Sequence, residues 1–316
     1  MFRIKLFFIL LSALLVTASF FVNKKNKPPQ KFLLERSYSV KNTSPTAAFK
    51  IKVNIPDVVS VQNAQVLKAT YSTQPKERKT FANGMQQMIF ELNLKPGEEQ
   101  IIKLEWEIQL KDMNVLETVK KPTLGAEEKE TLGAEEKELY LKSGTLYECD
   151  HPEIVKKTAE IISGKTTELE KSKAIFDYVK NNITFHRFGA ESKGALYALQ
   201  NGKGDCTEYA SLVVAMCRAA KIPSRLNGVM VLKTDTGSAG TDNHNHAEIF
   251  LEDYGWVPAE TTFKSASLGD MFNFEIILRK GLRTDKSNGW FSFNVATKYN
   301  NLKEIKMLGH KWKKIN

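Results

Sequence analysis

The sequence predicts an α+β chain in which an all-β sandwich precedes a domain of helices and strands. Apolar and polar residues alternate in three segments of the first third, at 49–55, 88–94 and 102–110. A period of two is typical of strands that bury one face. An Asn-Gly and a Pro-Gly dipeptide mark turns between them. We therefore expect a sandwich of immunoglobulin-like type over residues 31–115.

Helical patterns come first in the second half of the chain, and strands follow them. Pro152 opens a predicted helix that ends near Gly164, and Thr167 with Glu170 forms a capping box for the next. A short helix, one that begins after Asp205, and a strand then follow. The C-terminal segments FEIILRK and WFSFNVAT are expected to complete the sheet. We assign residues 141–316 to this second domain, which is therefore α+β.

Residues 116–140 are expected to link the two domains. The octapeptide TLGAEEKE occurs twice in succession from Thr123 to Glu138. Such a charged repeat cannot bury much surface, so we expect a solvated linker or a short exposed helix without chemistry.

Residues 1–22 predict export. Arg3 and Lys5 precede an apolar run from Leu6 to Val22, and lysines follow it. As a helix this run spans about 26 Å, which is short of a hydrocarbon core of roughly 30 Å. A cleaved signal peptide is therefore favoured over a membrane anchor, which stays possible. Export to a secreted, periplasmic or membrane-anchored location is therefore expected, and a cytoplasmic location would need the segment to be an inverted anchor.

Composition sets further bounds. The chain has 316 residues, of which 42% are hydrophobic, and a net charge of +10. It is long enough for two globular domains with cores of their own. The positive charge would suit anionic neighbours such as a membrane or acidic wall polymers, although a solvated surface explains it equally. No nucleic-acid-binding module is visible, and the sequence leaves the oligomeric state unknown.

Cys206 lies where a reactive thiol is expected. It follows Gly202, Gly204 and Asp205, and begins an amphipathic helical pattern that Pro223 ends. A helix start favours thiolate and offers a backbone N–H to an oxyanion. An unpaired cysteine is more often a small buried apolar residue, but two preceding glycines and an aspartate favour the catalytic interpretation.

A histidine and an acid follow on a predicted hairpin. If Gly255 is the left-handed residue that ends a loop of three residues, Glu252 pairs with Trp256. His246 and Glu260 are then diagonal neighbours on one face, about 7 Å apart between their Cα atoms. His244 is the rival base, since it is on the same face, but residues 241–245 are polar and resemble a loop. We therefore predict His246 as the base and Glu260 as its orienting acid.

These segments resemble the transglutaminase-like superfamily, whose members share a papain-like cysteine-protease core. The matching residues are GDC with Cys206, the helix ending in KIPSR, and HAEIFLEDYGWVPAETT with His246 and Glu260. The resemblance covers roughly residues 150–263. Glu260 stands where aspartate is usual, and Glu248 stands where many relatives carry tryptophan. The resemblance implies a papain-like core and catalytic roles for Cys206, His246 and Glu260. It also implies a β-sandwich before the core, which is a common arrangement in bacterial relatives.

The expected function is acyl transfer from an amide through a thioester, with a protein or peptide substrate that could be cell-wall peptide. Water as acceptor gives a peptidase or amidase, and an amine gives a transglutaminase; water is favoured. The rival hypothesis is a non-catalytic module that binds peptides or glycans in the same cleft. We expect no cofactor and no metal, because no metal-ligand spacing is present. A Cys149–Cys217 disulfide stays open, whereas Cys206 and Cys217 are too far apart on one helix.

Overall fold

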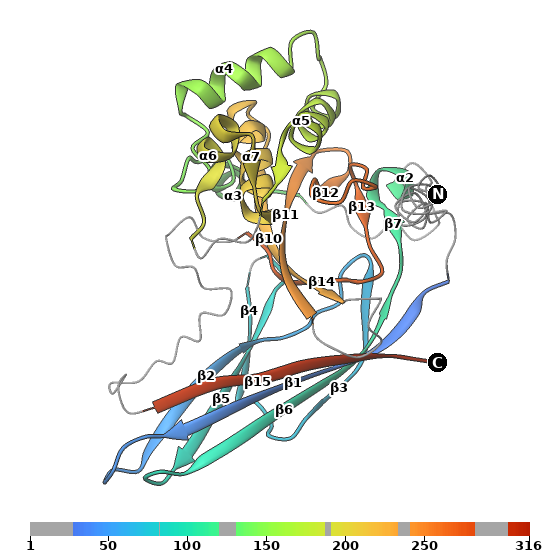
Figure 1. The fold of residues 1–316 in the computed structure, drawn as a ribbon. Helices are drawn as coiled ribbons and strands as arrows, with labels where there is room; N and C mark the ends of the chain where they lie inside the picture. The colour runs from blue at the N-terminus through green and yellow to red at the C-terminus, as the bar shows by residue number, and fades with distance from the viewer. Residues whose placement is uncertain (1–27, 82, 120–130, 187–190, 233–240, 282–302) are drawn as a thin grey trace, which may run out of the picture.

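The computed structural model describes residues 28–81, 83–119, 131–186, 191–232, 241–281 and 303–316. Two lobes make up this part of the chain, with strands in one lobe and the helices packed on a sheet in the other (Figure 1). The predicted α+β class is therefore confirmed. The expected export segment at 1–22 lies outside the described residues.

The N-terminal lobe is a β-sandwich. A sheet in the order β15-β1-β6-β3 faces one in the order β2-β5-β4, and all neighbouring strands are antiparallel. Alternate apolar side chains of both sheets form one buried core, with Trp106 fully buried in it. The immunoglobulin-like type stays a prediction. The strands are β1 (Gln30–Asn42), β2 (Phe49–Pro56), β3 (Ala64–Tyr71), β4 (Glu77–Thr80), β5 (Gln86–Leu94), β6 (Glu99–Leu110) and β15 (Lys303–Ile315).

The C-terminal strand β15 belongs to this sandwich. The sequence predicted that residues 264–316 complete the sheet of the second lobe, and for β15 this prediction is wrong. It runs beside β1 (Figure 1), and Trp312 packs edge-on against Phe32 with ring centroids 5.6 Å apart. The octad WFSFNVAT lies outside the described residues. The first and last strands of the described residues therefore lie in the same sheet, and the second lobe is inserted between the strands of the first.

Helices cover one face of the second lobe's sheet. The predicted capping box at Thr167 is present, and Pro152 is the first residue of its helix. The central helix α7 is buried on all sides from Cys206 to Arg218, whereas the sequence predicted one buried face. The helices are α4 (Pro152–Ile161), α5 (Glu168–Asn182), α6 (Gly194–Asn201) and α7 (Cys206–Ala219).

The sheet of the second lobe has the order β12-β11-β10-β14 and is antiparallel. Val229 and Ile277 pack in the core with the helices, and Met230 and Ile276 pack in the core of the sandwich. This sheet therefore connects the two cores. Its strands are β10 (Ser224–Leu232), β11 (Thr241–Leu251), β12 (Gly255–Ala259) and β14 (Glu275–Arg279).

Six short elements complete the described part of the fold. From the second octapeptide copy, the described residues include a short helix without buried side chains, as expected of an exposed segment. Among the described residues, no helix is long and apolar enough to cross a membrane. The short elements are β7 (Met113–Asn114), α2 (Val115–Val119), α3 (Ala134–Leu139), β8 (Thr184–Phe185), β9 (Lys203–Gly204) and β13 (Asp270–Met271).

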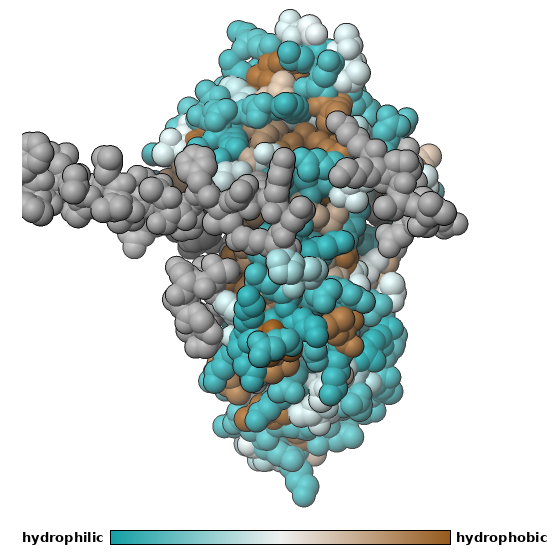
Figure 2. Space-filling view, turned by 90° about the vertical axis from the view of Figure 1, so that its right-hand side faces the viewer, coloured by the Kyte–Doolittle hydropathy of each residue, from teal (hydrophilic) through white to brown (hydrophobic). Residues whose placement is uncertain are grey.

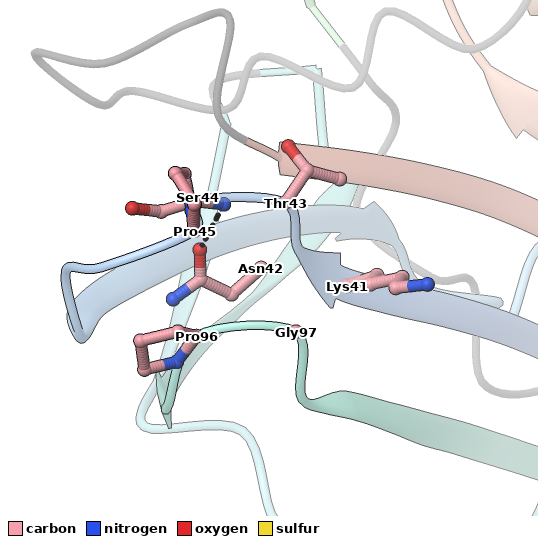
Figure 3. Close-up of a pocket in the computed structure, with 7 residues that line it drawn as sticks. All are labelled: Lys41, Asn42, Thr43, Ser44, Pro45, Pro96 and Gly97. Carbon is pink, nitrogen blue, oxygen red and sulfur yellow. Dashed lines mark hydrogen bonds between the residues drawn. The ribbon is translucent and has the colours of Figure 1, made fainter.

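Two surface features lie away from the helices. The sandwich face seen in Figure 2 is mainly hydrophilic, with scattered apolar residues. A pocket of about 390 Å³ opens at the tip of the sandwich (Figure 3), lined by residues 41–45, Pro96 and Gly97. Its lining contains no acid, histidine or cysteine, so it lacks the three groups of the predicted thiol site.

Candidate active site

The start of α7 is held by a complete capping box. The Asp205 side chain accepts from the Thr207 N–H at 2.8 Å, and Glu208 accepts from the Asp205 N–H at 3.0 Å. Gly204 is required there, because a Cβ at that position would lie 2.3 Å from the Glu208 Cβ. Glu208 also accepts from the Lys193 N–H at 2.7 Å. These hydrogen bonds therefore hold the backbone that precedes Cys206 against the first turn of α7.

Cys206 is the first residue of α7, and its side chain hydrogen-bonds the His244 ring. It is 2% exposed, so a substrate carbonyl reaches the sulfur only if neighbouring atoms move. A second contact joins the same elements, because the Asn245 side chain donates to Thr207 Oγ1 at 2.9 Å. Strand β11 and the first turn of α7 are thus held together at two adjacent positions.

His244 and Glu260 form the next contact. His244 Nε2 donates to Glu260 Oε2 at 2.5 Å, which leaves Nδ1 for the sulfur. Glu260 is fixed in turn, because its other oxygen accepts from the backbone N–H of Thr262 at 2.6 Å and of Phe263 at 3.2 Å. The Phe263 ring stacks on His244 with centroids 5.2 Å apart. Thiol, imidazole and carboxylate therefore form one buried relay.

Electrostatics favour the charged form of this pair. Burial lowers the pKa of His244, but Glu260 and Cys206 outweigh burial and hold that pKa well above its ordinary value. Burial raises the pKa of Glu260, and His244 beside it more than reverses this, so the pKa is lowered. An imidazolium next to a sulfur is the partner that stabilises a thiolate.

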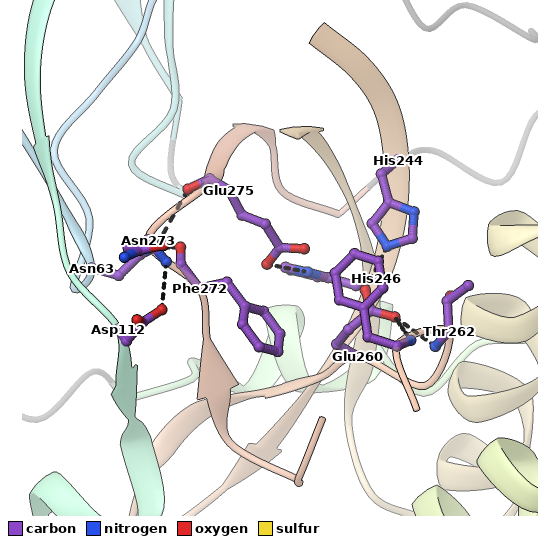
Figure 4. A network of polar contacts seen from close by, with 10 residues as sticks. Asn63, Asp112, His244, His246, Glu260, Thr262, Phe272, Asn273 and Glu275 are labelled. Atoms are coloured by element: carbon purple, nitrogen blue, oxygen red, sulfur yellow. Dashed lines mark hydrogen bonds and ion pairs between the residues drawn. The ribbon is translucent and has the colours of Figure 1, made fainter. Parts of the chain in front are cut away.

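The structure does not pair His246 with Glu260. His246 is buried behind the relay, with Nδ1 3.9 Å from Glu275 Oε2, and neither ring nitrogen has a hydrogen-bond partner among the described residues. Burial lowers its pKa, so the neutral ring is favoured. Figure 4 shows the two imidazoles, from the same strand, with Glu260 and Glu275 on different sides of them.

The hairpin register explains this difference. Gly255 is left-handed as predicted, with φ +72°, but it pairs with Leu251, and Trp256 pairs with Phe250 rather than with Glu252. When this register is extended past Ala259, Glu260 lies opposite His246 and diagonal to His244. The residues before His246 are also strand and not loop, because β11 continues along β10 to Thr241.

Glu248, which lies two residues after His246 on β11, has a buried partner of opposite charge. Arg225 Nη2 lies 2.7 Å from Glu248 Oε2, and both side chains are buried. The Arg225 guanidinium stacks on the Trp256 ring at 3.7 Å. Burial raises the pKa of Glu248, and Arg225 reverses this, leaving the pKa below its ordinary value. This pair is therefore structural and lies beside the relay.

One cluster has the composition of a metal site. Ligand atoms of His244, Glu260 and Glu275 lie within 4.8 Å of one another. However, His244 and Glu260 are bonded to each other at 2.5 Å, so we interpret the cluster as part of the relay. Cys149, Cys206 and Cys217 are all free thiols, so the Cys149–Cys217 disulfide is not formed.

The sequence reasoning missed several residues around the relay. The sequence analysis treated Glu275 only as part of the apolar segment FEIILRK. A glutamate inside an apolar strand could have been singled out as a candidate site residue, because burial of a carboxyl group is costly. No such signal marks Asn245, Thr207 or Phe263. Their roles depend on contacts between segments that the sequence does not place together.

The residues of the relay lie inside a stretch that a known family describes. Residues 155–261 match the model of the transglutaminase-like superfamily. The chain carries a transglutaminase-like core. This core contains Cys206, His244, His246 and Glu260, while Glu275 and the whole sandwich lie outside the matched residues.

Solved structures resemble a larger part of the chain than residues 155–261. A presumed cysteine protease from Cytophaga hutchinsonii is 13% identical, with a TM-score of 0.57 over 92% of this chain and 92% of that chain. The periplasmic domain of TgpA from Pseudomonas aeruginosa is 11% identical, with a TM-score of 0.39 over 76% of this chain and 89% of that chain. Among curated proteins, none matches. The likeness to the Cytophaga hutchinsonii structure concerns the fold alone, and the function is argued from the site.

Proposed function

We propose that the protein is a thiol enzyme that cleaves an amide bond, with Cys206 as nucleophile, His244 as base and Glu260 as orienting acid. The observation that carries the proposal is the continuous contact from sulfur to imidazole to carboxylate at the start of a buried helix. A purely structural cysteine has no use for an imidazolium partner.

The relay supports a two-step reaction. The Cys206 thiolate attacks the substrate carbonyl carbon, and the Cys206 backbone N–H at the helix start stabilises the oxyanion. His244 gives its proton to the leaving amine as the C–N bond breaks, and a thioester forms. His244 then takes a proton from water, whose oxygen attacks the thioester and releases the acid and the Cys206 thiolate, which restores the starting ion pair. Glu260 holds the His244 ring throughout.

The choice of acceptor and the location belong to the same proposal. Water is the favoured acceptor, which makes the enzyme a peptidase or amidase; an amine acceptor would make it a transglutaminase. The segment at Arg3 to Val22 supports export, and a peptide of the cell envelope is then an accessible substrate.

A binding module is the second candidate, and the 2% exposure of Cys206 is the observation that favours it. A cleft that never opens to the sulfur could still hold a peptide beside it. In that case a peptide would bind without any change in its mass.

Turnover in H₂¹⁸O tests the proposal. A peptide mixture is incubated with the protein, with and without a primary amine, and followed by mass spectrometry. We expect one ¹⁸O atom in each new carboxylate, loss of turnover in Cys206→Ala, and retention in Cys217→Ala, which removes a different buried thiol. Amine incorporation would assign the transglutaminase reaction instead. Binding without any mass change would contradict the enzyme.

A further inference from the structure

A second acid lies behind the relay without a role in the proposed reaction. Glu275 is the first residue of β14 and is 2% exposed. Its Oε1 has no hydrogen-bond partner among the described residues, and its Oε2 lies 3.9 Å from His246 Nδ1 (Figure 4). A buried carboxyl without a partner is costly, so its position calls for an explanation.

The charges around Glu275 decide its protonation. The described titratable groups that face it are His244 and His246 from β11 and Glu260, which follows β12. His244 is already bound to Glu260, and a second ionised carboxylate so close to Glu260 would be repelled. Burial first, and then Glu260, raise the pKa of Glu275 to about 8. Glu275 is therefore a neutral acid at neutral pH.

A neutral carboxyl can donate, and His246 is its nearest acceptor. The neutral His246 ring has one acceptor nitrogen, and a hydrogen bond needs Nδ1 and Oε2 about 0.9 Å closer than their present 3.9 Å. The contact therefore requires a small rotation of the Glu275 side chain toward His246. The O–H of Glu275 would then fix the tautomer of His246, whose ring lies beside His244 on the same strand.

The N-terminal sandwich holds the segment that carries Glu275. The Asn63 side chain donates to the Phe272 carbonyl at 2.9 Å and to the Glu275 carbonyl at 3.4 Å. Asp112, which follows β6, accepts from the Asn273 N–H at 2.9 Å. Figure 4 shows these contacts approaching Glu275 from the side opposite the imidazoles. The sandwich thus contacts the loop directly behind the relay.

We propose that Glu275 is a positioning residue of the thiol site, held by the N-terminal sandwich. As a neutral acid packed against His246, it fixes that ring and leaves Glu260 as the carboxylate that faces His244. The proposal rests on the proposed function, because it needs an activated Cys206. It also gives the sandwich a role beyond that of a spacer.

The test is the rate of Cys206 alkylation by iodoacetamide between pH 5.5 and 9.5, followed by peptide mass spectrometry. Wild type should show a change of slope near pH 8, where Glu275 ionises beside Glu260. Glu275→Gln keeps a donor and cannot ionise. It should stay within about threefold of wild type at pH 6.5 and lack that change of slope.

Glu275→Ala removes the donor, and its alkylation rate should fall about tenfold, the effect of one lost buried hydrogen bond. Ile276→Val is the matched control on the next residue of β14, and its rate and pH profile should equal those of wild type. If Glu275→Ala does not fold, the isosteric Glu275→Gln decides. Superimposable profiles of wild type and Glu275→Gln would overturn the proposal.

The two proposals fail in different ways. If wild-type Cys206 reacts no faster than the buried thiols Cys149 and Cys217, the proposed function fails, and the role of Glu275 fails with it. If Cys206 is activated in wild type and Glu275→Gln leaves the pH profile unchanged, only the role of Glu275 is overturned.

Discussion

Glu275 links the stability of the fold to pH, and Glu275→Gln isolates that link. Burial and Glu260 raise its pKa from 4.5 to about 8 in the folded chain. Because the folded state then binds a proton that the unfolded state releases, this contribution is fully present below pH 4.5 and is lost as pH rises through 8. The difference of 3.5 units (8 − 4.5) corresponds to about 5 kcal/mol at most.

The assay is urea unfolding of wild type and Glu275→Gln at several pH values from 5 to 9. The variant cannot ionise at this position, so the unfolding free energy of wild type should fall relative to that of the variant as pH rises from 5 to 9, by up to about 4 kcal/mol. Ile276→Val should cost about 1 kcal/mol at every pH. A difference between wild type and Glu275→Gln that stays constant from pH 5 to 9 would refute the reasoning.

Three further substitutions test the surroundings of the relay. Asp205→Ala removes the cap of α7 and should cost about 1 kcal/mol in urea unfolding and slow Cys206 alkylation, whereas Asp205→Asn should lose less; equal losses would contradict a capping role. Glu248→Leu leaves Arg225 buried without its partner and should lower the free energy of unfolding by about 3–5 kcal/mol. The double variant Glu248→Leu with Arg225→Met should recover most of that loss, and a double variant as unstable as the single one would contradict this account. Trp312→Ala opens the sandwich core and should cost about 3–5 kcal/mol while the folded protein keeps its Cys206 alkylation rate; an unchanged unfolding free energy would mean that β15 is not docked on β1.

Local signals in the sequence were sufficient for the elements around the thiol. Asp205 and Glu208 lie three residues apart before an apolar periodic run, and this pattern predicts a helix whose first residue is Cys206. The alternation at 49–55 and 102–110 likewise gives strands with one buried face. Each of these patterns depends on residues within a few positions, where propensity and periodicity operate.

The choice between His244 and His246 could not be made in the same way. It depends on the register of β11 against β12, and a loop of three residues can close on Leu251 or on Glu252 with the same Gly255. Polar residues before His246 resemble a loop in sequence, but pairing with β10 supplies their backbone with hydrogen-bond partners. The partner strand, and not the local sequence, therefore sets where β11 begins.

Contacts between distant segments were also beyond the sequence. Strand β15 pairs with β1, which lies more than 250 residues earlier in the chain. The sequence pattern of β15 does not indicate which strand it pairs with. The contact of Asn63 with the segment before Glu275 is of the same kind. Only the fold brings the N-terminal sandwich behind the relay.

The most direct test of the relay compares His244→Ala with His246→Ala in Cys206 alkylation at pH 7. Both variants remove a buried ring from the same strand, so each is the other's control for packing. We predict that His244→Ala slows alkylation by at least about a hundredfold, and that His246→Ala slows it by no more than about tenfold. A larger loss in His246→Ala than in His244→Ala would contradict the relay from Cys206 through His244 to Glu260.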